Sequence, residues 1–500
     1  MTNAVVAANP VGHVTLAPVE DSRRRGKIGL VLVGLMFLGV QLAVVPHPFG
    51  LSPDEANYLA KVDPSVPELY WSQPRAWGMP VLAAPVALFS ANLVVIRVYF
   101  GFLASLVLVA AFWPWLRILH PAVAPVAALL FSTTWMTVVY GSLVMPNLYL
   151  GLGAVAVVGL FLRAVQDSTW WRIASVGVVA TFITIVRPTD SVLVLAPLFA
   201  CALAVSRWRH LKVLGAIAVG SALGWLPWII EAYLRFGGPL ARLSAGETAG
   251  PGGLNPRIAN LLIYPRLLDG TPTFCCTGGT PPDAGPVPLV LTGWLVAFLL
   301  TASLGVVCAA RQGRLLEIML VGLPALLLAG FYLLLPRFTT LRFLLPVFAL
   351  LSLPVALALI HLVLMRSGGW RRAAAGVVVA ALSAHVGLML VKAERELDQS
   401  GRVRASQIEI ADAVRPLVEG RPCLLVAPAP QAVAFHLGCD AQTAGMSKRP
   451  PTRVSRAQAE GQLIVAILRS PPSRKSYMAS WRAVPVPGLP SRFRAYMPPG

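Results

Sequence analysis

Charged residues are scarce in this sequence: they make up 12% of its 500 residues, about half of the roughly 25% that soluble proteins carry. Acidic residues are the scarcest, with 21 Asp and Glu against 41 Lys and Arg. Hydrophobic residues make up 56% and gather in blocks, many of them near the roughly 17–25 residues that a helix needs to cross a bilayer. This composition excludes a soluble globular protein. It predicts an all-α polytopic membrane protein, because a helix satisfies its own backbone hydrogen bonds in lipid.

The six cysteines do not show the spacing of a metal site, so the sequence predicts no zinc centre. Cys275 and Cys276 are adjacent, which would strain a disulfide between them. Cys423 and Cys439 lie in the C-terminal tail, where we predict one disulfide if the tail occupies an oxidising compartment.

The basic residues lie mainly between the hydrophobic blocks. The formal net charge of +20 would indicate nucleic-acid binding only through the place where the cations gather. Lys and Arg in short loops instead orient a membrane protein, because they stay on the cytoplasmic side. We therefore expect a lipid bilayer, and no nucleic acid, as a partner of this chain.

The hydrophobic blocks predict about eleven spanning helices. These are residues 28–45, 93–117, 121–140, 146–164, 171–186, 190–206, 213–231, 286–309, 315–335, 342–364 and 373–391. The fifth and sixth are short and also fit a tilted or re-entrant pair. Because they come as a pair, either choice leaves the side of every later loop unchanged.

The charges of the short loops predict a cytoplasmic N-terminus. The cytoplasmic set then comprises Arg23, Arg24, Arg25 and Lys27; Arg163 and Arg172; Arg207, Arg209 and Lys212; Arg311 and Arg314; and Arg366, Arg371 and Arg372. The short loops of the opposite side hold few cations. The first apolar run is too long for a signal-peptide core and lacks a small-residue cleavage site, so we expect a retained anchor in the plasma membrane.

This topology divides the chain into a cytoplasmic tail (1–27), a transmembrane domain (28–391) and a small extracytoplasmic α/β domain (392–500). Two long outer loops, 46–92 and 232–285, interrupt the transmembrane domain. The second is rich in Gly and Pro, a composition typical of a mobile loop. We expect it to order on substrate.

The C-terminal domain alternates short apolar strands with helical stretches, the pattern of a small α/β fold. The predicted strands are Cys423–Ala427, Leu463–Leu468 and Trp481–Val486, and the predicted helices are Arg404–Val418 and Gln431–Leu437. The domain carries 16 Lys and Arg against 8 Asp and Glu. This excess favours anionic lipid head groups or acidic wall polymers, and equally fits a merely solvated face.

Two adjacent carboxylates, Asp54 and Glu55, follow the first spanning segment. Acids beside a membrane are costly to desolvate and often mark a site. Transfer of a sugar to a hydroxyl or amine needs a base against the acceptor proton, and either acid fits that role. The alternative is a structural one, in which Ser52, Asp54 and Glu55 cap the start of a surface helix.

The motifs that surround these acids resemble those of GT-C fold glycosyltransferases, in the branch that contains protein O-mannosyltransferases and the lipid A aminoarabinose transferase. They are Asp54-Glu55 followed by Tyr58, the Gln73-Pro74-Arg75-Ala76-Trp77 turn of the same loop, Arg97 at the second spanning helix, Arg187-Pro188 between two short helices, and Arg342-Phe343-Leu344-Leu345-Pro346 at a late helix. The resemblance extends over residues 28–391 in order and topology. Gln73 and Asn147 depart from it, because the family often has His at the first position and an acid near the second.

The resemblance implies inverting transfer of a sugar, a hexose or a pentose, from a polyprenyl-phosphate donor to an extracytoplasmic glycan, lipid or protein. Asp54 matches the catalytic base, and Glu55 is its neighbour that would position the acceptor or a divalent ion. Tyr58, Gln73, Arg75 and Trp77 match the part of the first loop that meets substrate. No other cofactor is implied.

A lipid phosphate needs cationic partners, and Arg suits it best because its planar fork bonds two oxygens. Arg187, Arg337 and Arg342 are predicted at the outer ends of spanning helices, and Arg257 and Arg266 lie in the second outer loop. We predict that these five bind the donor phosphate. Taken singly, each also fits an ordinary anchor that reaches to the interface.

Two other functions fit the same composition. A transporter or flippase would show paired repeats and ionisable groups near the bilayer centre, whereas most charges here lie at segment ends. A non-catalytic assembly factor would tolerate replacement of Asp54 and Glu55.

Overall fold

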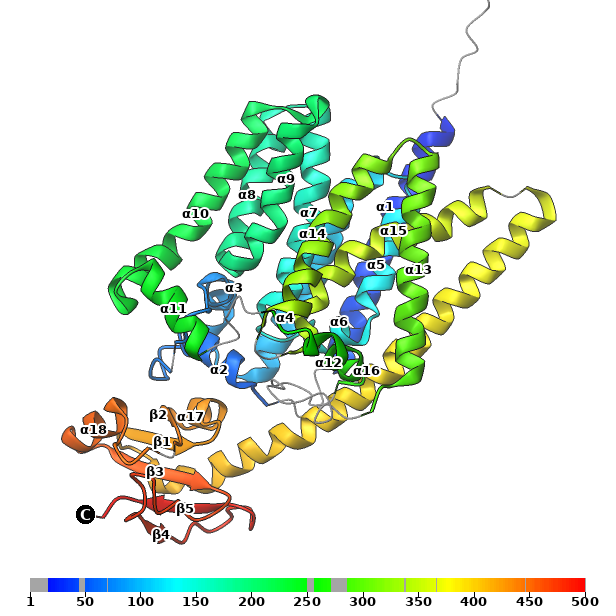
Figure 1. Ribbon diagram of the computed structural model, residues 1–500. Coiled ribbons are helices and arrows are strands. Elements are labelled where there is room, and N and C mark those ends of the chain that lie inside the picture. The colour runs from blue at the N-terminus through cyan, green and yellow to red at the C-terminus, as the bar shows by residue number, and fades with distance from the viewer. Residues whose placement is uncertain are drawn as a thin grey trace, which may run out of the picture.

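A computed structural model of the chain describes residues 17–44, 50–69, 71–249, 256–270, 286–336, 339–365, 367–445 and 447–499. It consists of a bundle of long helices with a small α/β unit beyond one end (Figure 1). Within the described residues, eight helices are long and apolar enough to cross a membrane. The chain is a multi-pass membrane protein, as the composition predicts.

The bundle is built from consecutive helices. They are α1 (Ala17–Val44), α4 (Leu93–Phe112), α5 (Val123–Ser132), α6 (Trp135–Tyr140), α7 (Pro146–Gln166), α8 (Trp170–Val186), α9 (Pro188–Ala204), α10 (Leu211–Phe236), α13 (Leu289–Arg311), α14 (Leu315–Leu334), α15 (Leu345–Leu364) and α16 (Gly368–Val418). Short 3₁₀ turns follow α4 (Trp113–Arg117) and α9 (Ser206–Trp208) and precede α15 (Leu341–Leu344). The centre is formed by α7 and α15, whose spans are 83% and 78% buried against 17–39% for the other six long spans.

All eleven predicted spanning segments fall on these helices, but three differ from a simple long span. The predicted segment 121–140 is broken into α5 and α6. At the break, the Thr133 and Thr134 hydroxyls donate to the carbonyls of Leu129 and Phe131, 2.7 and 2.9 Å away. Such bonds compete with the helical ladder. The other two are α8 and α9, with 17 residues each.

Small residues let neighbouring helices approach closely, as is usual for helices that meet within a membrane. An added Cβ on Gly220 of α10 would lie 3.0 Å from the Cβ of Ala180 on α8 and would meet the Gly177 carbonyl. A Cβ on Gly305 of α13 would likewise meet the backbone of Pro354 on α15. Larger side chains at either glycine would push these helix pairs apart.

Four shorter helices gather at one end of the bundle, which we call the α2 end (Figure 1). They are α2 (Pro53–Leu59), α3 (Gly78–Ala87), α11 (Pro239–Ala249) and α12 (Ala259–Leu267). The first two come from the loop 46–92 and the other two from the loop 232–285, so the structure brings the two long predicted loops together. Cys275 and Cys276 lie outside the described residues.

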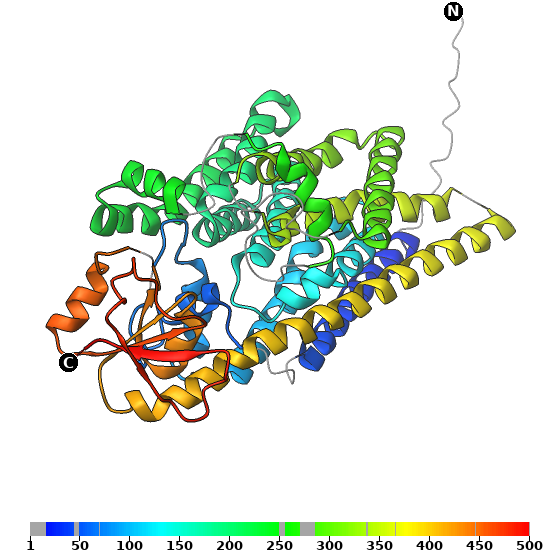
Figure 2. The ribbon, with the colours of Figure 1, turned by 60° about the horizontal axis from the view of Figure 1, so that its bottom comes forward.

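The longest helix, α16, joins the bundle to the α/β unit and runs without interruption for 51 residues (Figure 2). The predicted domain boundary at residue 392 and the predicted helix Arg404–Val418 both lie inside it. The connecting residues between the two predicted pieces include Lys392, Glu394 and Glu396, which are good helix formers. The polar composition that marks the end of the membrane segment is therefore not a signal for the end of the helix.

The α/β unit holds a five-stranded sheet in the order β2-β1-β3-β5-β4, parallel among β2, β1 and β3 and antiparallel beyond. Its strands are β1 (Cys423–Ala427), β2 (Asp440–Thr443), β3 (Leu463–Leu468), β4 (Arg482–Val484) and β5 (Arg494–Met497), with helices α17 (Gln431–Leu437) and α18 (Thr452–Ala459). The predicted strands Cys423–Ala427 and Leu463–Leu468 and the predicted helix Gln431–Leu437 are confirmed. The sequence does not predict β2 and β5, because each is only four residues long and contains polar side chains.

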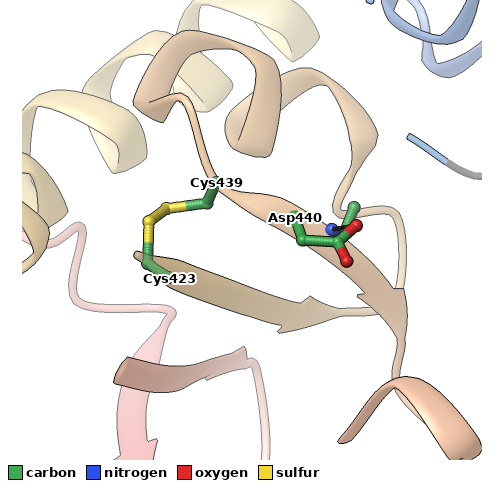
Figure 3. The surroundings of a disulfide bond; sticks show 4 residues. Cys423, Cys439 and Asp440 are labelled. Atoms are coloured by element: carbon green, nitrogen blue, oxygen red, sulfur yellow. Dashed lines mark hydrogen bonds between the residues drawn. A yellow bond between two sulfur atoms is a disulfide. The ribbon is translucent and has the colours of Figure 1, made fainter. Parts of the chain in front are cut away.

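A disulfide joins Cys423 to Cys439, as predicted. It connects the start of β1 to the residue before β2 (Figure 3). Because α17 lies between the two cysteines in sequence, the disulfide fixes the two ends of the β1–α17 segment against each other.

Candidate functional site

Helix α2 carries both predicted acids and begins with a complete capping box. The Glu55 backbone N–H donates to the Ser52 hydroxyl over 3.3 Å, and the Ser52 N–H donates to Glu55 Oε2 over 2.9 Å. Pro53 occupies the first turn, where its missing N–H costs nothing. The capping alternative therefore holds for Ser52 and Glu55, and Asp54 is left to face elsewhere.

Glu55 is fully buried and surrounded by donors. Its Oε1 accepts from Arg97 of α4 and from the Val144 N–H at 3.0 Å, and its Oε2 lies 3.4 Å from Arg404 of α16. Burial raises the pKa of Glu55, but the charges of Arg97 and Arg404 outweigh it and hold the pKa at about 2. With its oxygens held by protein groups and no exposed surface, Glu55 is placed to orient α2 rather than to meet an acceptor or a divalent ion.

Asp54 points away from the Glu55 pocket, because neighbouring residues of a helix differ in direction by about 100°. Its Oδ1 accepts from Arg75 at 2.7 Å and its Oδ2 accepts from Arg342 at 2.9 Å. The side chain stays 32% exposed. Burial raises the pKa of Asp54, but the two guanidinium charges, Arg342 first, hold the pKa well below its usual range. Asp54 is therefore an ionised and accessible carboxylate between two cations.

A third arginine, Arg187, contacts the same aromatic ring as Arg342. Arg187 donates to Asp190 at 2.7 Å and to the Tyr332 hydroxyl at 2.8 Å. Phe343 stacks on Tyr332 and lies under both Arg187 and Arg342, 5.5 and 5.7 Å from its centroid. Cation–π contacts of this kind hold a guanidinium in place without consuming its donors. Both arginines therefore contact the same ring at the α2 end.

The first-loop residues predicted to meet substrate form a packed aromatic and cationic wall beside Asp54. Tyr58 contacts Trp71 edge to face at 5.9 Å and lies 6.0 Å from the Arg75 guanidinium. Trp77 packs at an angle on Trp71 and lies 4.8 Å from the Lys61 ammonium. Burial raises the pKa of Tyr58, so its hydroxyl stays protonated and can donate. Tyr58, Arg75 and Asp54 therefore belong to one cluster.

Gln73 is held through its backbone rather than its side chain. Its carbonyl accepts from Arg242 of α11 over 3.0 Å, and the same guanidinium donates to the Arg75 and Trp228 carbonyls, each at 2.9 Å. Arg242 is fully buried and also pairs with Glu231 at 3.0 Å. This single side chain fixes the turn from Gln73 to Arg75, and thereby the arginine that holds Asp54 Oδ1.

Arg242→Met is expected to destabilise the protein strongly, because it leaves the Glu231 carboxylate and three carbonyls without that partner in a buried place. Breaking a buried ion pair costs about 3–5 kcal/mol. The measurement is the midpoint of thermal unfolding of the purified protein in detergent. Arg235→Met is the control: Arg235 also pairs with Glu231 but is 42% exposed, and its loss should lower the midpoint little. Equal midpoints for the two variants would contradict this role.

A small pocket, with room for about one water molecule, adjoins Arg342 and opens to solvent. Its lining consists of Trp135, Tyr140, Leu267, Gly270, Thr339, Thr340, Leu341 and Arg342. Aromatic faces, hydroxyls and one cation are the groups that bind sugars and phosphates. Arg342 therefore both pairs with Asp54 and contributes its cation to this pocket.

Two of the other three arginines predicted to bind the donor phosphate lie on α12 or just before it. Arg266 sits on α12 and donates to the Leu262 carbonyl of the same helix. Arg257 precedes α12, and its backbone N–H donates to the Leu334 carbonyl at 2.6 Å. Arg337 lies outside the described residues. Among the described residues, no three His, Cys, Asp or Glu side chains gather to hold a metal ion, and we assign no step to one.

Three structurally important arginines were not predicted as site residues. Arg97 was marked only by its place in a motif, and neither Arg242 nor Arg404 stands in any motif. Arg404 is separated from Glu55 by 349 residues, so no local pattern could connect the two.

Comparison with known proteins gives a match to the fold. No protein-family model and no curated protein matches the sequence. The crystal structure of ArnT from Cupriavidus metallidurans bound to undecaprenyl phosphate superposes with a TM-score of 0.62 and 14% identity, over 93% of this chain and 97% of that one. The archaeal oligosaccharyltransferase AglB from Archaeoglobus fulgidus, in complex with an inhibitory peptide and a dolichol-phosphate, gives 0.50 and 11%, over 87% and 69%.

These similarities define the class of architecture: the chain has the GT-C fold of membrane glycosyltransferases. The fold predicted from the sequence motifs is confirmed, including the small α/β unit at the C-terminus.

Proposed function

We propose that this chain is a membrane glycosyltransferase that moves a sugar from a polyprenyl-phosphate donor to an extracytoplasmic acceptor. The observation that supports it most is Asp54, an accessible carboxylate held between Arg75 and Arg342 at one end of a GT-C bundle. The solved relatives bind undecaprenyl phosphate and dolichol-phosphate, lipids of the class that the donor would release. The disulfide favours an oxidising compartment for the α/β unit and hence for the α2 end.

In the proposed reaction, Asp54 accepts the proton of the acceptor hydroxyl or amine as that atom attacks the anomeric carbon. The bond between the anomeric carbon and the phosphate oxygen breaks, and polyprenyl phosphate leaves with the electron pair. Attack opposite the leaving group inverts the anomeric centre. Arg342 and Arg187 bind the phosphate, because the planar fork of a guanidinium group matches its oxygens. A phosphate contact of Arg337, Arg257 or Arg266 stays a prediction from the sequence.

Donor binding also prepares the base. In the resting arrangement, two arginines stabilise the Asp54 anion and so make it a weak base. A donor phosphate that takes over Arg342 would release Asp54 Oδ2 and raise its affinity for a proton. The enzyme would thus gain its base only when the leaving group is in place.

This coupling has a consequence for the dependence of activity on pH. Because the pKa of Asp54 is lowered in the free protein, kcat/KM for the donor should not fall from protonation of Asp54 between about pH 8 and pH 5. With donor bound, the pKa should rise, so kcat should begin to fall at a higher pH than kcat/KM does. Steady-state rates of the wild type measured across this range would test it, and kcat and kcat/KM that begin to fall at the same pH would contradict it.

A direct test of the donor class needs no knowledge of the sugar. Undecaprenyl phosphate is titrated into the purified protein in nanodiscs and binding is followed by tryptophan fluorescence or native mass spectrometry. Undecaprenol, which lacks the phosphate, is the matched control. We expect saturable binding that depends on the phosphate, and equal binding of the two lipids would count against the proposal.

A further inference from the structure

The helix that carries Asp54 is held in part from the C-terminal segment. Arg404 lies on α16, beyond its predicted membrane span, and its side chain is only 4% exposed. Its Nη1 donates to the Gly50 carbonyl at 2.8 Å and lies 3.4 Å from Glu55 Oε2. Gly50 precedes α2 and Glu55 lies in its first turn, so one guanidinium from the distant segment holds both the entry to the helix and its start.

The fit at Gly50 is close enough to exclude a larger residue. A Cβ added to Gly50 would lie 3.0 Å from the Cβ of Arg404 and 3.1 Å from its carbonyl oxygen. The Gly50 carbonyl also lies 3.4 Å from Arg97 Nη2, so it is shared between α4 and α16. The chain that leads into α2 is therefore enclosed by the backbone of α16 and by two guanidinium groups.

A second contact from the α/β unit reaches the same helix. Helix α17 packs against α2, and the two lie next to each other in Figure 1. A Cβ on Gly438, at the end of α17, would lie 3.6 Å from the Ser65 carbonyl, just beyond α2. The Cys423–Cys439 disulfide ties the ends of the β1–α17 segment together. The α/β unit thus contacts α2 along one side while Arg404 holds its start.

We propose that Arg404 is a positioning residue through which the C-terminal segment sets the direction of the Asp54 carboxylate. The inference rests on the proposed function of Asp54. The buried pair of Glu55 with Arg97 and Arg404 fixes the rotation of α2 about its own axis. Because Asp54 is the adjoining residue, that rotation decides whether its oxygens reach Arg75 and Arg342 and, in the reaction, the acceptor proton.

Arg404 acts by position rather than in the chemistry, since it holds Gly50 and Glu55 while Asp54 pairs with Arg75 and Arg342. Its loss should leave the binding of undecaprenyl phosphate unchanged and lower kcat. Arg404→Lys keeps the charge but not the fork that reaches two acceptors, so α2 should be held in place less firmly than in the wild type and more firmly than in Arg404→Met.

The test uses the full chain in nanodiscs and compares Arg404→Met with Arg402→Met. Arg402 lies half a turn away on the same helix and is exposed, which makes it a matched control. Hydrogen–deuterium exchange is followed in peptides that cover residues 50–60. We expect exchange there to be faster by about tenfold or more in Arg404→Met, intermediate in Arg404→Lys, and unchanged in Arg402→Met.

A second variant covers the case in which Arg404→Met does not fold. Gly50→Ala should force Gly50 and Arg404 apart and speed exchange in the same peptides. Exchange like that of the wild type in whichever of these variants folds would overturn the proposal. The exchange experiment needs no transferase activity, so its failure is distinguishable from failure of the proposed function. Where turnover is measurable, kcat should fall by about tenfold in Arg404→Met, with the KM for the donor unchanged.

Discussion

Asp54→Asn is expected to lower kcat by about 10²–10⁴-fold, the range that a general base contributes, while the protein still folds. The amide keeps the size of the carboxylate and can still accept from Arg75 or Arg342, but it cannot take a proton. Removing the negative charge also frees the two arginines from their ion pairs. Undecaprenyl phosphate should therefore bind Asp54→Asn at least as tightly as the wild type, and turnover with a polyprenyl-phosphate sugar should be lost.

The combination of lost turnover and retained lipid binding distinguishes a base from a structural ion pair. Glu68→Gln is the matched control, because Glu68 lies in the same loop and also pairs with two cations, Lys61 and Arg235. Its side chain is 40% exposed, so its loss should change neither turnover nor binding. Turnover of Asp54→Asn within a few-fold of the wild type would remove Asp54 from the role of base.

Arg342→Ala should weaken binding of undecaprenyl phosphate by about 30-fold or more, because truncating one partner of a buried, charged contact costs roughly 2–5 kcal/mol. Arg342 is 9% exposed, pairs with Asp54 and lines the adjoining pocket. The lipid affinity of Arg342→Lys should fall between those of the wild type and Arg342→Ala, since Lys supplies the charge without the planar fork. The dissociation constant in nanodiscs is the quantity to measure.

Arg235→Ala serves as the control for loss of one positive charge at the same end of the bundle. Arg235 pairs with Glu68 and is 42% exposed, so its contribution should be small. If Arg342→Ala and Arg235→Ala bound the lipid equally well, Arg342 would not be a phosphate contact. If Arg342→Ala lost binding and also unfolded at a lower temperature, the loss could come from the missing phosphate contact or from lower stability. Arg342→Lys would distinguish these causes, because it keeps the charge next to Asp54.

The sequence predicted the bundle well, because burial in a bilayer imposes a pattern that does not depend on distant contacts. A helix must be apolar over its whole length to lie in lipid, so each predicted span corresponds to a helix or a broken pair of helices. The pattern does not predict where a helix stops outside the membrane. For this reason α16 continues for about seven turns past its predicted span, and the short polar strands β2 and β5 were missed.

The candidate site was predicted in its acids but not in their division of labour. The dipeptide Asp54-Glu55 fits a capping box and a catalytic pair equally, and the choice between them depends on which side of α2 faces the bundle. That side is set by Arg97 and Arg404, which come from segments far away in the sequence. Likewise, Arg75 was predicted within a motif, whereas the residue that fixes its turn, Arg242, comes from a helix in the second long loop.

The central claim is that this chain consumes a polyprenyl-phosphate sugar, and the lipids of a strain that lacks the chain test it most directly. Polyprenyl lipids and envelope glycans would be compared by mass spectrometry among the deletion strain and strains complemented with the wild type or with Asp54→Asn. The account predicts that one polyprenyl-phosphate sugar accumulates and one glycan is lost in the deletion strain and in the Asp54→Asn strain, and that the wild type restores both. Unchanged lipids and glycans, or full restoration by Asp54→Asn, would contradict it.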